Sequence, residues 1–274
     1  MPNPLHSIVQ SAPIQVPGAY NALTCCLIEQ MGFSAAYVSG AAFSAADLAV
    51  PDIGLFTLTE LLGHVKKMID AVDIPLIVDA DTGFGEAINV ERTVLELDAI
   101  GVAAIQLEDQ ELPKKCGHLD GKVLVSPERM AAHLSVAAEA TEDAIIIART
   151  DARAVEGIDQ AINRAKRYLD AGANWIFPEA MQDRDEFEQF AKAIDAPLVA
   201  NMTEFGKSPL LTFEELADLG YAAVIYPVTL LRSSMKAAEL ALAVLASNGT
   251  QAELLDVMQT REELYQLLNY DPES

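Results

Sequence analysis

The stretch Gly101-Val102-Ala103-Ala104-Ile105-Gln106-Leu107-Glu108-Asp109 contains the pattern from which the fold of this chain is predicted. A glycine closes an amphipathic segment, a mostly apolar run follows, and two carboxylates end the run. Glycine at a helix end is the usual left-handed cap, and a short apolar run without polar alternation is typical of a parallel strand buried on both faces. The stretch therefore predicts a helix end, a buried strand and a polar strand end in succession.

Similar units recur along the whole chain. The candidate strands are Ile14–Pro17, Ala35–Ser39, Pro75–Val78, Ala103–Leu107, Ala144–Ala148, Trp175–Phe177, Pro197–Ala200 and Ala222–Tyr226. The candidate helices are Ala19–Met31, Thr57–Ala71, Ala87–Ile100, Ser126–Ala140, Gly157–Ala171, Asp183–Ile194, Thr212–Leu219 and Leu230–Leu245. Eight such units in about 250 residues predict a (β/α)8 barrel of the TIM type. A doubly wound open sheet is the rival, but the first candidate strand lacks a glycine-rich phosphate loop after it.

Length and composition fit one domain. With 274 residues and 51% hydrophobic content, the chain is able to bury a large core. Two amphipathic segments, 252–258 and 262–268, follow the eighth unit. We therefore expect a single barrel domain over residues 1–274, of which 249–274 form a C-terminal helical extension.

The chain is strongly acidic, with 41 acidic and 18 basic residues and a formal net charge of -23. Nucleic acid and anionic membranes are therefore poor partners. A small anionic substrate is not excluded, because a few buried arginines and a metal ion reverse the field locally.

The cysteines and the N-terminus indicate the compartment. The chain has three cysteines, Cys25, Cys26 and Cys116, and an odd number argues against a disulfide framework. The N-terminus lacks the pattern of a signal peptide, and no apolar run is long enough to span a bilayer. We expect a soluble protein of the reducing cytoplasm.

Polar residues gather where the candidate strands end. Active sites of such barrels lie at the C-terminal ends of the strands. Those ends carry Ser39, Asp79, Asp81, Glu108, Arg149, Glu179, Asn201 and Thr203. Turns alone favour Asp, Asn and Gly, so any single residue says little, but the convergence of carboxylates, an arginine and an amide indicates a site.

Asp79 and Asp81 are one residue apart, so in an extended chain both side chains point the same way. With Glu108 they form an oxygen-rich set suited to Mg²⁺ or Mn²⁺; the alternative is that the aspartates cap the next helix. Arg149 and Arg232 are candidate clamps for carboxylates, and surface ion pairing is their alternative.

The loop after Glu108 contains Lys114-Lys115-Cys116-Gly117-His118. A thiol becomes reactive when nearby positive charge stabilises its thiolate, and Lys114, Lys115 and His118 carry such charge. The alternative is a solvated lysine pair beside an ordinary small hydrophobic residue.

Over essentially its whole length the chain resembles the isocitrate lyase and 2-methylisocitrate lyase branch of the phosphoenolpyruvate mutase superfamily. Lys114-Lys115-Cys116-Gly117-His118 is the signature loop of that branch. The other matching segments are Tyr37–Gly40, Val50–Gly54, Val78–Gly85, Ala148–Ala152, Phe177–Ala180, Asn201–Gly206 and Met258–Tyr265. The large insertions of isocitrate lyases are absent, which favours the 2-methylisocitrate lyase side. Ala41 is a mild departure, because the family has a second glycine after Gly40.

The resemblance implies a Mg²⁺-dependent carbon–carbon lyase, with Mn²⁺ as a possible substitute, that cleaves 2-methylisocitrate to pyruvate and succinate in the methylcitrate cycle of propionate catabolism. It implies a cytoplasmic homotetramer that exchanges C-terminal helices. The alternatives are cleavage of isocitrate or 2,3-dimethylmalate, a related oxaloacetate decarboxylase or phosphonate-type enzyme, and an inactive barrel that only binds ligands.

The resemblance also implies residue roles. Asp79 would bind the metal directly, and Asp52, Asp81 and Glu108 would hold its waters. Cys116 would protonate the succinate carbanion, with Tyr37, Lys114 and His118 as further catalytic residues. The substrate would contact Ser39, Gly40, Ala41, Gly117, Arg149, Glu179, Asn201, Met202, Thr203, Arg232 and Arg261. Phe177 and Ile225 would leave room for the extra methyl group, which is worth only about 1–3 kcal/mol of discrimination.

Overall fold

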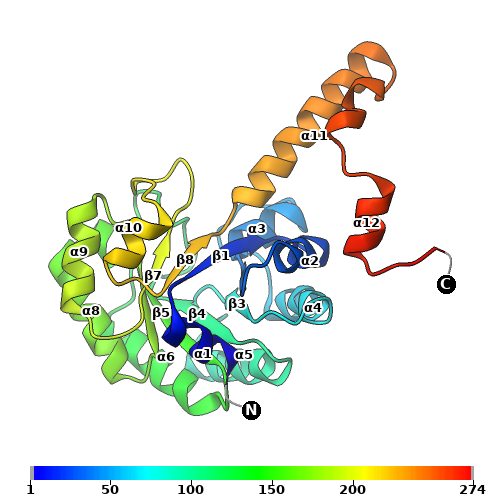
Figure 1. The fold of residues 1–274 in the computed structure, drawn as a ribbon. Helices are drawn as coiled ribbons and strands as arrows, with labels where there is room; N and C mark the ends of the chain where they lie inside the picture. Colours follow the sequence, from blue (N-terminus) through cyan, green and yellow to red (C-terminus); the bar gives the residue numbers. More distant parts are fainter. Residues whose placement is uncertain (1–2, 273–274) are drawn as a thin grey trace.

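Parallel strands arranged as a barrel form the centre of the molecule (Figure 1). The computed structural model describes residues 3–272. The strands are β1 (Ile14–Ala19), β2 (Ala36–Val38), β3 (Leu76–Asp79), β4 (Ala104–Glu108), β5 (Ile145–Thr150), β6 (Trp175–Pro178), β7 (Val199–Asn201) and β8 (Ala223–Tyr226). They follow the order β6-β5-β4-β3-β2-β1-β8-β7, and a parallel bridge between Ile176 and Leu198 joins the two outer strands. The predicted barrel is confirmed.

The helices surround the strands, as the alternation predicts (Figure 1). The predicted ones are α2 (Ala22–Gln30), α4 (Leu58–Ile69), α5 (Ala87–Ala99), α6 (Pro127–Ala140), α8 (Ile158–Asp170), α9 (Arg184–Ala193), α10 (Phe213–Asp218) and α11 (Thr229–Asn248). Three short helices were not predicted, namely α1 (Pro4–Ser11), α3 (Gly40–Ala46) and α7 (Ala152–Glu156). They are too short to show a clear periodicity, and α3 and α7 begin directly after strand ends.

Local sequence explains where these elements begin and end. Thr57 and Glu60 form a capping box at the start of α4, so two free backbone N–H groups find acceptors. The residues after α5 and α10, Gly101 and Gly220, have φ angles of +94° and +98°, which side chains with a Cβ rarely adopt.

Two apolar layers hold the barrel together. The inner layer fills the barrel with side chains such as Ile77, Ile147 and Trp175, and the outer layer lies between strands and helices. Leu5 of α1 belongs to the inner layer and is fully buried. Helix α1 therefore closes the amino-terminal end of the barrel.

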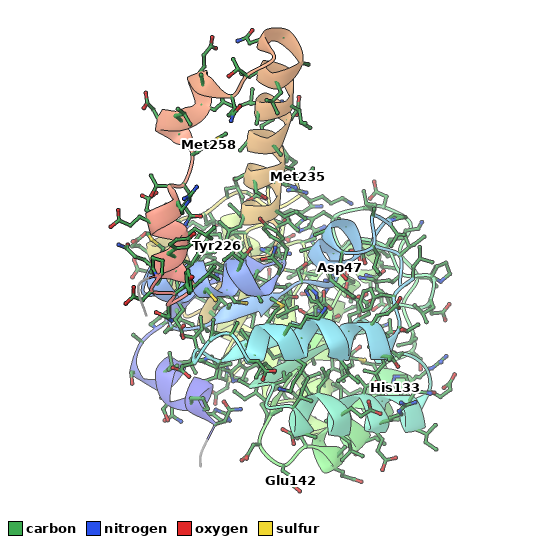
Figure 2. All side chains as sticks on the ribbon, turned by 90° about the vertical axis from the view of Figure 1, so that its right-hand side faces the viewer. Asp47, His133, Glu142, Tyr226, Met235 and Met258 are labelled. Atoms are coloured by element: carbon green, nitrogen blue, oxygen red, sulfur yellow. The ribbon has the colours of Figure 1, made fainter. Side chains whose placement is uncertain are left out.

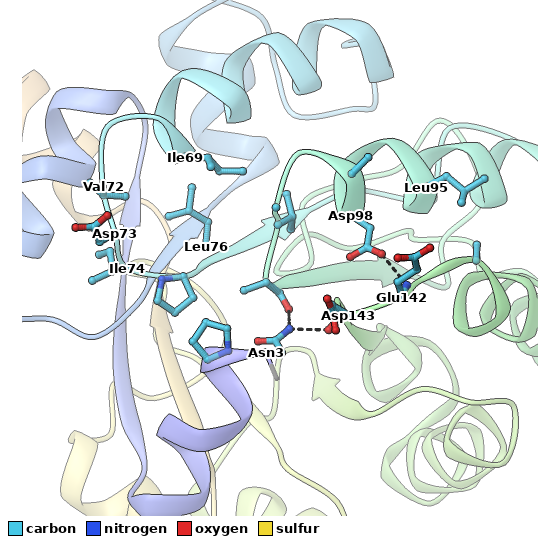
Figure 3. A pocket seen from close by; sticks show the side chains of 17 residues that line it. Asn3, Ile69, Val72, Asp73, Ile74, Leu76, Leu95, Asp98, Glu142 and Asp143 are labelled. Carbon is cyan, nitrogen blue, oxygen red and sulfur yellow. Dashed lines mark hydrogen bonds between the residues drawn. The ribbon is translucent and has the colours of Figure 1, made fainter. Parts of the chain in front are cut away.

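A hollow of about 480 Å³ lies beside α1 at this end of the barrel (Figure 3). The Asn3 side chain donates hydrogen bonds to the carbonyl oxygens of Ala103 (2.6 Å) and Asp143 (2.8 Å). Asp98 accepts from the backbone N–H groups of Glu142 (2.7 Å) and Ala144 (3.0 Å). The hydrogen bonds of Asn3 and Asp98 hold the start of α1 and the helix α5 to the residues just before β4 and β5, so we assign these polar groups to stabilising the fold.

Helix α11 extends from the barrel as an arm, and the chain then turns back toward α2 (Figure 1). None of the described α11 residues is buried. Figure 2 shows Met235 on the arm and Met258 on the returning segment. Residues 252–257, expected to be an amphipathic helix, form a 3₁₀ helix, and α12 (Arg261–Leu267) follows. Within residues 3–272, the helices are too short or too polar to cross a membrane.

Candidate active site

The polar strand ends meet at a cavity of about 80 Å³ at the carboxyl end of the barrel. Its wall consists of Tyr37, Ser39, Ala41, Asp52, Asp79, Cys116, Gly117, His118, Arg149, Phe177, Glu179, Asn201, Thr203, Ile225, Pro227, Val228 and Arg232. The ends of parallel strands face one direction, so residues far apart in sequence converge here. The loop after β4, residues 111–122, covers the cavity with Cys116, Gly117 and His118; we call it the lid.

Asp79 is held in one orientation by N–H donors. Its Oδ2 accepts from the backbone of Gly40 at 3.2 Å, and its Oδ1 accepts from the backbone of Asp81 at 3.1 Å and from Gln106 Nε2 at 3.0 Å. Tyr37 donates its hydroxyl proton to Gln106 Oε1 at 2.5 Å. Gln106 thus links Asp79, the expected metal ligand, to Tyr37, an expected catalytic residue. The sequence analysis missed Gln106, although an amide inside an otherwise apolar strand could have indicated it.

Asp81 does not continue the strand, contrary to the expectation that it extends alongside Asp79. β3 ends at Asp79, and Asp81 has a φ of +49°, because the chain turns there into the loop before α5. Its Oδ1 lies 2.5 Å from Lys114 Nζ, which is also 2.5 Å from Asp52 Oδ1. Burial raises the pKa of Asp81 to about 7 although the charge of Lys114 opposes this.

Glu108 is the last residue of β4 and is only 2% exposed. Its Oε2 lies 3.3 Å from Arg149 Nη1, but neither carboxylate oxygen has a hydrogen-bond donor among residues 3–272. Burial raises the pKa of Glu108 well above its usual range. Buried oxygens without donors, beside further carboxylates, suit a hard divalent cation.

Four acidic residues, Asp52, Asp79, Asp81 and Glu108, therefore have the chemistry that a cation needs. In the described chain, however, no three Asp, Glu, His or Cys side chains lie close enough together to hold a metal ion as they stand. The Lys114 ammonium lies between Asp52 and Asp81 and offsets part of their negative charge. The carboxylates of Glu108 and Asp81 hold the pKa of Lys114 well above its usual range, although burial alone would lower it.

The thiol of Cys116 is not activated by the lysine pair, and that expectation is wrong. Burial raises the pKa of Cys116, with smaller opposing effects from the backbone N–H of His118 and the charge of Arg149. Lys114 pairs with carboxylates, and Lys115 Nζ donates to the carbonyl oxygens of Asp120 (3.4 Å) and Gly121 (2.8 Å). The thiol therefore stays protonated, as an acid must before it acts.

His118 is oriented from both sides. Its Nδ1 accepts the backbone N–H of Lys207 at 2.9 Å, so the proton of the neutral ring lies on Nε2, which is 3.1 Å from Glu179 Oε1. Burial would raise the pKa of Glu179, but the charge of Arg149 and the hydrogen bond from His118 lower it to about 2. Glu179 is thus a buried carboxylate that remains charged.

The two candidate arginine clamps have different surroundings. Arg149 is 8% exposed; its Nε and Nη2 lie 3.0 and 3.3 Å from the carboxylate oxygens of Asp151, and its guanidinium is 5.3 Å from the ring centre of Phe177. Arg232 is more exposed and donates to Glu204 O (2.7 Å) and Oε2 (2.9 Å) at the cavity edge. Arg149 is therefore buried and not a surface residue. Arg232 does form a surface ion pair, with Glu204, which was the alternative to its role as a carboxylate clamp.

Three of the predicted substrate residues are not part of this cavity wall. Met202 is 3% exposed and packs in the outer apolar layer, because it alternates with Asn201 and Thr203, which line the cavity. Arg261 begins α12, where it is exposed and outside the cavity wall. Gly40 contributes its backbone N–H to Asp79 rather than a surface to the cavity.

Comparison with known proteins agrees with this geometry. The chain matches the phosphoenolpyruvate phosphomutase family over residues 5–246. It is 52% identical to 2-methylisocitrate lyase of Aeropyrum pernix over 97% of this chain and 86% of that protein. Its structure is similar to that of a 2,3-dimethylmalate lyase, with a TM-score of 0.91, 30% identity and coverage of 98% and 92% of the two chains. It is also similar to phosphonopyruvate hydrolase in complex with oxalate and Mg²⁺, with a TM-score of 0.88, 30% identity and coverage of 98% and 95%. The chain belongs to the phosphoenolpyruvate phosphomutase family.

Proposed function

We propose that this protein is a Mg²⁺-dependent carbon–carbon lyase that cleaves 2-methylisocitrate to pyruvate and succinate, as in the methylcitrate cycle of propionate catabolism. The observation that carries the proposal is that the thiol of Cys116, on the lid, lines the same cavity as the buried Arg149 and the carboxylates of Asp52 and Asp79. A reaction that produces a carbanion next to a carboxylate needs such an acid. The 52% identity to a 2-methylisocitrate lyase supports the same substrate.

The proposed reaction uses the residues of the cavity wall. The substrate hydroxyl gives its proton to a charged carboxylate of the cavity wall, for which we propose Glu179; the bond to the neighbouring carbon then breaks, and its electron pair remains on the succinate fragment. Cys116 gives its proton to that carbon, and Arg149 holds a carboxylate of the keto acid. Burial, with the charge of Asp79, raises the pKa of Tyr37 well above its usual range, so we assign its phenol to orienting the hydroxyl.

The carboxylate cluster would bind the cation. Asp79, fixed by N–H donors, is the proposed direct ligand, and Asp52, Asp81 and Glu108 would hold its waters. A bound Mg²⁺ or Mn²⁺ would supply Lewis acidity at the hydroxyl and keto-acid oxygens. The Mg²⁺ in the complex of the related phosphonopyruvate hydrolase supports this assignment.

Phe177 and Ile225 support the choice of substrate. Both line the cavity, and we propose that the space beside them accepts the methyl group that isocitrate lacks. Isocitrate, 2,3-dimethylmalate, and oxaloacetate or phosphonate substrates remain the alternatives within the family.

One assay tests the activity. Purified protein with Mg²⁺ receives 2-methylisocitrate, isocitrate and 2,3-dimethylmalate in parallel, and release of keto acid is followed. We expect 2-methylisocitrate to be cleaved fastest, and a preference for isocitrate would contradict the proposal. Cys116→Ser is expected to lower kcat by about 10²–10⁴-fold, because general acid catalysis contributes that much, while the circular dichroism spectrum stays unchanged.

We also propose that residues 1–274 work as one barrel domain, with 249–274 as an extension, in a cytoplasmic homotetramer that exchanges C-terminal helices. The support is the α11 arm, on which Met235, Leu240 and Leu242 are 60%, 57% and 66% exposed. An apolar helix face without a partner in its own chain usually marks an interface. Arg261 would reach a substrate only through such an assembly.

The assembly is tested by light scattering after gel filtration. Leu242→Lys on α11 is expected to reduce the molar mass of the assembly, because it places a charge in the proposed interface. Ile88→Lys is the matched control, since Ile88 is 74% exposed on α5. An unchanged mass for Leu242→Lys would contradict the exchange of α11.

A further inference from the structure

Lys122, at the end of the lid, is a buried lysine for which the proposed reaction has no role. Its side chain is 1% exposed. Its Nζ lies 2.7 Å from Asp151 Oδ1 and also donates a hydrogen bond to the carbonyl oxygen of Gly117. Lysine is rarely buried unless it is paired, so both contacts need an explanation.

Asp151 is a fixed part of the barrel. It is fully buried, and its backbone N–H donates to Asp109 Oδ1 at 2.9 Å. The carboxylate of Asp151 accepts hydrogen bonds from Arg149 Nε at 3.0 Å and from Arg149 Nη2 at 3.3 Å. The ammonium of Lys122 therefore connects the lid to the carboxylate that orients the arginine of the cavity.

Gly117 is the lid residue that lies directly on this arginine. A Cβ at Gly117 would stand 2.1 Å from Glu179 Oε1 and 2.4 Å from Arg149 Nη2, so no other residue fits without displacing them. Its neighbours in the chain are Cys116 and His118, which line the cavity. A group that fixes the carbonyl of Gly117 therefore fixes the backbone on which the thiol is carried.

We propose that Lys122 is a positioning residue, whose ammonium joins Gly117 of the lid to Asp151 of the barrel and thereby places the Cys116 thiol over the substrate held by Arg149. The effect on turnover rests on the proposed function, because it takes Cys116 as the proton donor. The competing explanation is an ion pair that stabilises the fold without placing the thiol.

Lys122→Met tests this, with Lys115→Met as the matched control. Lys115 is on the same lid, but its ammonium donates to the backbone carbonyls of Asp120 and Gly121, which belong to the lid itself. We expect Lys122→Met to lower kcat about 100-fold, the effect of misplacing a reacting group by about 1 Å, with KM changed much less. Amide hydrogen exchange at residues 116–118, measured without substrate, is expected to become at least about tenfold faster. The control is expected to behave as wild type.

Two results would overturn the proposal. One is Lys122→Met with wild-type kcat, and the other is unchanged exchange at residues 116–118, which would leave only a contribution to the fold. If Lys122→Met does not fold, Lys122→Gln replaces it with the same criteria, because its amide is polar enough for this buried site but is shorter and lacks the charge that pairs with Asp151. If the wild type fails to cleave 2-methylisocitrate, the proposed function fails, and the exchange measurement still decides whether Lys122 holds the lid.

Discussion

The ammonium of Lys114 lies 2.5 Å from Asp81 Oδ1. It is also 2.5 Å from Asp52 Oδ1, so one lid lysine pairs with two carboxylates of the proposed metal site and offsets part of their charge. Because Lys114 is part of the lid, the position of the lid and the charge of the cluster depend on each other. A cation that binds the cluster meets a positive charge already in place.

Lys114→Met is therefore expected to strengthen Mn²⁺ binding by about tenfold. The reason is that a buried positive charge beside the ligands makes the binding free energy of a cation less favourable by about 1–2 kcal/mol at short range. Binding is measured by titration calorimetry or by the electron paramagnetic resonance signal of free Mn²⁺. Lys115→Met is the control and is expected to keep wild-type affinity. Weaker binding in Lys114→Met would show that Lys114 supports the metal site rather than competing with the cation.

The raised pKa of Cys116 predicts how turnover depends on pH. The acid form of the thiol is the active form, so the loss of the Cys116 proton is expected to lower kcat only above the usual thiol range. The same shift predicts that iodoacetamide alkylates Cys116 at pH 8 more slowly than it alkylates N-acetylcysteine, because the thiolate is the nucleophile. Peptide mass spectrometry separates Cys116 from Cys25 and Cys26. Faster alkylation than the free thiol would contradict the raised pKa.

The low pKa of Glu179 predicts how the free energy of unfolding depends on pH. Its pKa is about 2 in the folded protein against a normal value of 4.5, so the group stabilises the fold above pH 4.5, and this contribution is lost as the pH falls toward 2. The shift corresponds to about 3 kcal/mol. Glu179→Gln does not titrate, and its stability is expected to fall less steeply than that of wild type between pH 5 and 3. The check is urea unfolding at each pH, and parallel curves for the two proteins would contradict the low pKa.

Leu5 is the side chain with which α1 closes the base of the barrel, and it is fully buried. Leu5→Ala is expected to lower the free energy of unfolding by about 2–5 kcal/mol, because it leaves a cavity in the inner apolar layer. Denaturant unfolding measures the change. Leu23→Ala, at a position 42% exposed on α2, is the control and is expected to cost far less.

Short-range patterns determine much of the fold. An apolar run such as Ile145–Ala148 is buried wherever it lies, and a glycine such as Gly101 ends a helix through its own backbone freedom. The alternation of such segments leaves few topologies, so the barrel was predictable from the sequence. So was the convergence of Asp79, Arg149 and Glu179 at one end, which parallel strands require. Met202 was misplaced, although alternation with Asn201 and Thr203 already indicated that it faces the other side.

By itself, the sequence determined the barrel, the end of the barrel at which the polar residues meet, and the loop that carries Cys116. Only the tertiary structure decided which charges pair. Lys114 faces Asp52 and Asp81, whereas the sequence indicated that it activates the thiol of Cys116. Lys122, which the sequence did not single out, faces Asp151. The physical reason is that burial and counter-charges set the state of an ionisable group, and at this site they come from segments that only the folded chain brings together.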